Sequence, residues 1–154
     1  MSVNVDHVAR MNLIKSSLQD FLASAPVPGA ASRIITRSWK PLQNHTDDDL
    51  LCGIYTLIAV SEGNYRNYNG GEALDGTQKM LLIGRLRVPS NVGGGEADGE
   101  AIEDAEWSML DNEIAPWLRA LPQALCCLEA KNVVLSGQLG APYASVVVEL
   151  EECV

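Results

Sequence analysis

Cysteine and histidine side chains are the groups in this chain that could act as nucleophiles or bind a metal ion. They are Cys52, Cys126, Cys127, Cys153, His7 and His45. No two cysteines have the C-x-x-C spacing of a zinc or redox site, and neither histidine lies near a cysteine in the sequence. The cysteines lie within or beside apolar stretches, where a thiol is usually a small buried hydrophobic group. We therefore predict reduced thiols, no metal site and no Cys–His nucleophile.

Carboxylates are the other groups that could bind a cation. The run Asp47–Asp49 lacks the alternating ligands and the fixed glycine of a calcium loop, so we expect a solvated turn. The glycine-rich stretch GGGEADGE at 93–100 has neither the spacing nor the lysine of a phosphate-binding loop, and no G-x-S-x-G motif occurs. The sequence therefore predicts no catalytic residue and no cofactor.

Acidic and basic residues are unevenly distributed along the chain, whose formal net charge is −9. Residues 1–40 carry five basic and two acidic side chains, whereas residues 91–113 carry eight acidic side chains and no basic one. A surface of that sign repels nucleic-acid phosphates and anionic membranes, so neither is an expected binding partner. The acidic run is either the solvated face of a helix or a surface directed at another subunit or a channel. Trp107 lies off the apolar stripe of that helix and is a candidate contact residue.

The first half of the chain has the pattern of one helix followed by three strands. Apolar residues at three- and four-residue steps predict an amphipathic helix at 5–23, which a Pro/Gly-rich segment ends. A short strand is expected at 33–39, and the QNHTDDD that follows favours a polar turn. The apolar runs at 51–60 and 79–88 predict two long strands, joined as an extended β-hairpin by the polar loop at 61–78.

The second half begins with a flexible, glycine-rich loop at 89–99. A helix is expected from about residue 100, with a kink at Pro116, whose ring clashes with the carbonyl four residues earlier. Two strands follow, at 127–136 and 143–151. In the order α-β-β-β-α-β-β, the elements predict one α+β domain over residues 1–154, a mostly antiparallel sheet with helices packed on one face. No bilayer-spanning apolar stretch and no signal peptide are recognised, so synthesis in the cytoplasm is expected.

Four segments define this layout. They are the helix VARMNLIKSSLQDFL leading to RIITRSW, the hairpin LCGIYTLIAV…KMLLIGRLRV, the helix ending in EIAPWLRALPQ, and the closing hairpin KNVVLSGQLGAPYASVVVELEE. The layout resembles, over nearly the whole chain, that of the tail terminator proteins of long-tailed bacteriophages, also called minor tail or tail-completion proteins. The resemblance lies in the arrangement of elements and not in a signature motif.

The resemblance implies a structural protein of the virion tail, made in the host cytoplasm, and not an enzyme. Tail terminators form a six-membered ring on the growing tail tube, stop its polymerisation and receive the head connector. The implied partners are thus other copies of the chain, the tail tube protein and the head–tail connector, while DNA only passes through an acidic lumen. In a head-to-tail ring, a basic side of one subunit meets the acidic segment of the next. The candidate interface residues are Arg33, Arg37, Glu96, Asp98, Glu103 and Trp107, and the loops at 61–78 and 89–99 are expected to contact neighbours.

Three other functions are compatible with the sequence. A head–tail connector or neck protein would differ only in its place in the particle. An adaptor domain would bind a basic protein partner through the acidic residues at 96–113. A small enzyme would use Cys126 or the run Asp47–Asp49.

Overall fold

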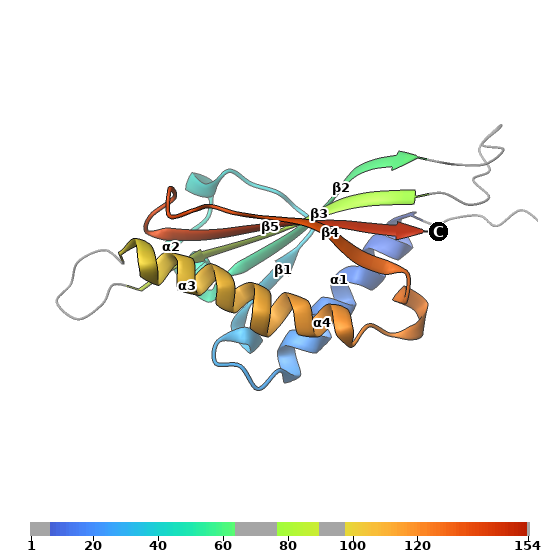
Figure 1. The fold of residues 1–154 in the computed structure, drawn as a ribbon, viewed down its shortest axis with the longest axis horizontal. Helices are drawn as coiled ribbons and strands as arrows, with labels where there is room; N and C mark the ends of the chain where they lie inside the picture. The colour runs from blue at the N-terminus through green and yellow to red at the C-terminus, as the bar shows by residue number, and fades with distance from the viewer. Residues whose placement is uncertain (1–6, 64–76, 90–97, 154) are drawn as a thin grey trace, which may run out of the picture.

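The sheet at the centre of the fold has five strands in the order β1-β2-β3-β5-β4 (Figure 1). The strands are β1 (Ile34–Thr36), β2 (Ile54–Gly63), β3 (Thr77–Arg87), β4 (Leu128–Leu135) and β5 (Tyr143–Cys153). β1 pairs in parallel with β2 and the other neighbouring pairs are antiparallel, so the sheet is mixed. The computed structural model describes residues 7–63, 77–89 and 98–153. The predicted α+β class is confirmed.

The described residues form four α-helices beside the sheet. These are α1 (His7–Ser24), α2 (Asp47–Cys52), α3 (Gly99–Met109) and α4 (Ala115–Arg119), with short 3-10 turns at Ala30–Ser32, Leu42–Asn44 and Gln123–Leu125. The observed order differs from the predicted one because α2 replaces the expected polar turn. The Thr46 hydroxyl caps α2 by accepting a hydrogen bond from the Asp49 amide at 3.2 Å, and the acidic first turn favours the helix dipole. No described helix is long and apolar enough to cross a membrane.

The main hydrophobic core lies between one face of the sheet and the helices α1, α3 and α4. α1 contributes side chains at the predicted three- and four-residue steps, Met11, Ile14, Leu18 and Leu22. Alternate residues of β3 and β5 enter the same core, among them Met80, Leu82, Val146, Val148 and Leu150. Trp117 of α4 is 1% exposed, and its indole N–H donates to the Ser17 hydroxyl at 3.1 Å. This bond ties α4 to α1.

α2 and the segment before it lie on the other face of the sheet (Figure 1). Arg85 and Arg87 of β3 reach them from that face. Arg85 Nη1 donates to the Lys40 carbonyl at 2.7 Å, and Arg87 forms an ion pair with Asp47 at 2.6 Å. The expectation that all the helices pack on one face therefore does not hold. This second layer covers only one end of the face, since Val60, near the far end of β2, is 54% exposed.

α3 continues into α4 through a π-helical turn, Leu110–Ile114, where the sequence predicts a kink. Pro116 lies in the first turn of α4 and has no amide hydrogen to donate back into the π-turn. The wider π-turn adds a residue to the helical register. As a result, the consecutive residues Glu113 and Ile114 are both buried, at 1% and 0% exposure. The turn thus brings a carboxylate into the core.

Candidate interaction surfaces

Arg33, a candidate interface residue, lies inside its own subunit. Its Nε and Nη2 donate to the two carboxylate oxygens of Glu113 at 2.9 and 3.0 Å, and its Nη1 donates to the Cys52 carbonyl at 2.7 Å. The Tyr55 hydroxyl donates to the same carboxylate at 3.0 Å. The side chains of Arg33 and Glu113 are 9% and 1% exposed. Arg33 therefore does not belong to an outer basic surface, which corrects the expectation from the sequence.

Within this cluster, charges and hydrogen bonds offset the cost of burial. Burial acts to lower the pKa of Arg33, but the hydrogen bond and negative charge of Glu113 outweigh it, so this pKa is raised overall. Burial raises the pKa of Tyr55 well above its ordinary value, and the Glu113 carboxylate raises it further. Arg33 thus stays charged and Tyr55 stays a neutral donor. The cluster joins the segment before β1, strand β2 and the π-turn.

Two other buried carboxylates also connect helices to the sheet. Glu152 of β5 forms an ion pair with Arg10 of α1. Glu106 of α3 accepts hydrogen bonds from the Ser136 hydroxyl and amide, and from the Ser145 amide at 2.7 Å. Among the residues that the structure describes, no group of three or more His, Cys, Asp or Glu side chains could hold a metal ion. Through their bonds to Arg10, Ser136 and Ser145, these two carboxylates stabilise the fold.

Three further candidate interface residues lie at the surface, near the ends of elements or between them. Asp98 is the N-cap of α3. Glu103 accepts a hydrogen bond from the Gln138 side chain at 2.7 Å. Arg37 donates to the Asn12 side chain at 2.9 Å. All three are exposed, so their role in an interface stays a prediction.

α3 and its π-helical extension carry an acidic surface, called here the acidic stripe. It consists of the exposed residues Glu100, Glu103, Asp104, Trp107 and Asp111. Their spacing puts them on one side of the helix, opposite the buried Ile102 and Met109. Trp107, at the centre of the stripe, is 46% exposed. Glu96 and the loop residues 64–76 and 90–97, which were expected to contact neighbours, lie outside the described residues.

A basic surface lies where the chain passes from β1 to α2, and is called here the basic–aromatic patch. It consists of Trp39, Lys40 and Arg85, and Arg37, which bonds to Asn12 of α1, lies beside them in the sequence. The guanidinium carbon of Arg85 lies 5.4 Å from the centre of the Trp39 ring, a cation–π contact, and Trp39 stays 50% exposed. Burial lowers the pKa of the neighbouring His45, and the positive charges of Arg85 and Lys40 lower it further. The sequence analysis missed Trp39 and Arg85, although the order R-S-W-K places an aromatic ring between two basic residues.

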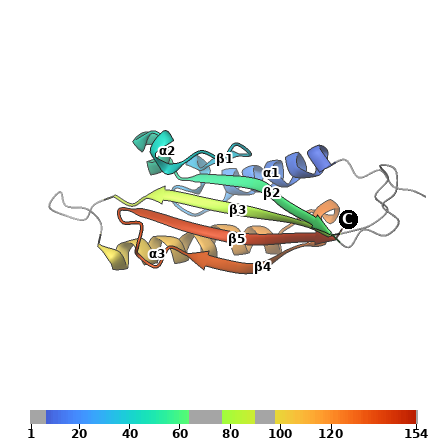
Figure 2. The same ribbon diagram turned by 90° about the horizontal axis from the view of Figure 1, so that it is seen from above.

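The acidic stripe and the basic–aromatic patch lie on opposite faces of the sheet. α3 packs against β5, next to the edge strand β4, on the core face (Figure 2). Arg85 belongs to β3, the middle strand, and bonds on the second face to the segment that connects β1 to α2 (Figure 1). Each subunit therefore presents a negative surface on one side and a positive surface on the other.

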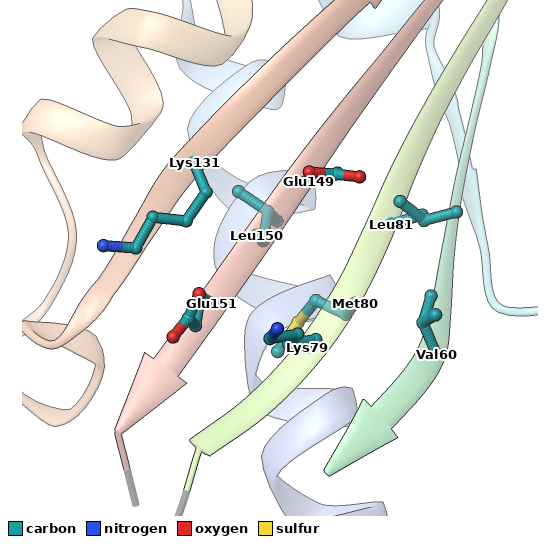
Figure 3. A pocket seen from close by; sticks show the side chains of 8 residues that line it. All are labelled: Val60, Lys79, Met80, Leu81, Lys131, Glu149, Leu150 and Glu151. Atoms are coloured by element: carbon teal, nitrogen blue, oxygen red, sulfur yellow. The ribbon is translucent and has the colours of Figure 1, made fainter. Parts of the chain in front are cut away.

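The end of the second sheet face that α2 does not cover is hollowed (Figure 3). The hollow has a volume of about 270 Å³ and spans four strands. Val60 and Leu81 line it together with Lys79, Lys131, Glu149 and Glu151. β2 and β4 each have a bulge at the same level of the sheet, and bulges increase the local twist, which accounts for the concave shape. Val134, on the same face of β4, is 53% exposed.

The cysteines are placed differently from the expectation. Cys126 and Cys127 are exposed at the end of a 3-10 turn, with their sulfur atoms 3.9 Å apart. Cys52 is half-buried. The expected burial is therefore wrong for the adjacent pair, because the strand predicted to begin at Cys127 begins at Leu128.

Comparison of the chain with models of known protein families and with curated proteins finds no match. We therefore infer its function from the two charged surfaces, the uncovered end of the sheet and the layout of its elements.

Proposed function

We propose that this protein is a structural subunit of a bacteriophage tail, and that its copies form a ring, six-membered as in tail terminators. The ring would cap the tail tube, stop its polymerisation and provide the docking surface for the head connector. The protein would be made in the host cytoplasm and reside in the virion. It would act by binding other proteins and not by catalysis.

The observation that carries this proposal is the uncovered end of the second sheet face. Val60 is about half exposed there, and Leu81 lines the hollow together with charged side chains. Val134, on the same face of the edge strand β4, is also about half exposed. Apolar groups gathered on an exposed sheet and bordered by charges are typical of a protein-binding surface. Such a surface fits a subunit that is completed by a neighbour, by the tube or by the connector.

The charge of the chain supports a ring through which DNA passes. Each copy carries a formal net charge of −9, so a ring of copies is strongly acidic. Acidic walls do not adhere to phosphates, which favours passage over binding. A head–tail connector or neck protein would share these properties, and only its position in the particle distinguishes the two assignments.

An adaptor domain that binds a basic protein is the second candidate. The acidic stripe, with Trp107 at its centre, favours it, because carboxylates and an exposed indole together bind lysine and arginine side chains. An adaptor needs no self-association. The oligomeric state therefore separates the two functions.

The test is to incubate the purified chain with tail tube protein from the same genome. Native mass spectrometry gives the mass of the assembly, and negative-stain electron microscopy gives its position on the tubes. We expect a closed ring at one end of each tube and tubes that stop growing. Tubes that grow at the same rate, with a chain that stays monomeric, would overturn the proposal. Rings found at the portal and never on tubes would favour the connector.

A further inference from the structure

We propose that the acidic stripe of one subunit binds the basic–aromatic patch of a second copy of this chain. The contact specifies which surfaces meet in the ring of the proposed function, and in that respect it rests on that function. It differs from the pairing expected from the sequence, because Arg33 is engaged inside its subunit. Trp39, Lys40 and Arg85 provide most of the basic side in its place.

The acidic stripe is available to a partner. Its side of the helix points away from the sheet, since Ile102 and Met109, on the opposite side, are buried. Glu103 bonds to Gln138. Within the described part of the chain, Asp104 and Asp111 make no hydrogen bond or ion pair through their carboxylates, so their charges are uncompensated. The carboxylates of the stripe therefore repel one another, and a second subunit that brought cations to them would remove this repulsion.

The basic–aromatic patch has the matching chemistry. Arg85 packs against the Trp39 ring and holds the Lys40 carbonyl, which fixes the orientation of this segment. The Lys40 side chain is exposed, and Arg37 keeps donors free beyond its one bond to Asn12. Cations from this patch can pair with the carboxylates of the stripe and also stack on Trp107. Tryptophan and arginine are the residues that most often dominate binding at protein interfaces.

The positions of the two surfaces decide the symmetry of the contact. Because they lie on opposite faces of the sheet, one copy cannot pair them within itself (Figure 1). Each copy uses its stripe toward one neighbour and its patch toward the other. Such a heterologous contact produces a closed ring when the rotation between neighbours closes.

Complementary charge reversal tests the contact. In one variant, Asp104→Lys with Asp111→Lys reverses two of the four negative charges of the stripe. In the other, Arg37→Glu with Lys40→Glu reverses two positive charges in and beside the patch. Under conditions where the natural chain assembles, we expect each variant alone to lose the oligomer in native mass spectrometry. An equimolar mixture should regain it, as complexes that contain equal numbers of the two variants. Circular dichroism checks that both are folded.

A charge-matched control separates this contact from a general effect of charge. Asp20→Lys with Gln19→Lys and Ala23→Lys changes three exposed residues of α1, away from the stripe, the patch and the uncovered sheet face. This control alters the net charge as much as the first variant and should assemble like the natural chain. If it loses the oligomer to the same extent, the proposed contact is overturned.

The outcomes distinguish the contact from the function. Reversed variants that assemble alone overturn the contact and leave the ring in place, as does a mixture that regains no oligomer. A mixture that regains even-numbered complexes without any effect on tube growth supports the contact and overturns the function. A natural chain that never self-associates, with or without tubes, overturns both. Binding only to an unrelated basic protein supports the adaptor instead.

Discussion

Replacing Glu113 with glutamine tests whether the buried cluster holds the fold together. Its carboxylate accepts three hydrogen bonds, two from Arg33 and one from the Tyr55 hydroxyl. A glutamine amide has nearly the same shape but only one oxygen. Its NH₂ group would face a donor of Arg33, and the guanidinium, 9% exposed, would lose its counter-charge. We therefore expect the variant to fold with a clear loss of stability.

The size of the loss follows from these contacts. Removing one partner of a buried ion pair costs about 3–5 kcal/mol. Arg33 keeps its bond to the Cys52 carbonyl and a little contact with water, so we expect a cost near the lower limit, about 3 kcal/mol. For a domain of 154 residues, each kcal/mol lowers Tm by about 2–4 °C, which gives a fall of about 6–12 °C.

Urea unfolding followed by circular dichroism measures this difference, provided that the slope of the transition is unchanged. Asp111→Asn is the matched control, because Asp111 is an exposed carboxylate two residues away, and its loss should change stability by less than about 0.5 kcal/mol. Replacing the cluster by Arg33→Met, Glu113→Leu and Tyr55→Phe together should recover most of the loss, since no buried charge is then left unpaired. A Glu113→Gln variant as stable as the control would refute this account of the cluster.

Three other changes have outcomes that the structure predicts. Gly84→Ala should lower the free energy of unfolding by about 1–3 kcal/mol in the same urea assay, because its methyl group would lie 2.8 Å from the Tyr55 ring, which Glu113 holds in place. His45 has a lowered pKa when folded, so the unfolded chain takes up the proton first. The stability that the neutral His45 side chain contributes is therefore lost as the pH falls below about 6.5. An NMR titration of His45 should give a midpoint below that of the unfolded chain. Cys126 and Cys127 should react rapidly with a thiol reagent in the native state, and replacing both with serine should change stability by less than about 0.5 kcal/mol.

The sequence predicted the elements whose hydrophobic period is regular. The helix expected at 5–23 is α1, and the strand expected at 143–151 is β5. Alternate residues of β5 lie on the core side, where Val146 and Val148 are fully buried. The apolar stripe of α1 is not buried along its whole length, since Val8 is 60% exposed. Periodicity alone therefore did not give the buried length of the helix.

Elements that depend on distant contacts could not be predicted. The strand expected at 33–39 is only Ile34–Thr36, because Arg33 turns inward to a carboxylate 80 residues away. Beyond the strand, the Ser38 amide bonds to the Thr36 hydroxyl at 3.0 Å and takes the backbone away from the sheet. Neither interaction has a signal in the local sequence. For α2 the local sequence does carry a signal, the capping residue Thr46 followed by three aspartates.

The acidic run at 98–113 is divided by helical geometry into two groups with different consequences. Glu106 and Glu113 face the sheet and are bonded there, to backbone and hydroxyl groups or to Arg33. The acids of the acidic stripe face outward. Sequence analysis treated the whole run as one surface, because composition counts charges without regard to the side of the helix on which they lie.

This division allows assembly to be separated from folding. A change at Glu106 or Glu113 removes partners from buried donors, so it should lower stability in the isolated subunit before any effect on assembly can be measured. A change at Asp104 or Asp111 leaves the core untouched. If the acidic stripe binds a neighbour, these outer changes should abolish the oligomer at unchanged Tm. A variant at Asp104 or Asp111 that assembles normally would exclude the stripe from the interface, and so would one that loses assembly only because it unfolds. The uncovered sheet face would then be the surface to examine.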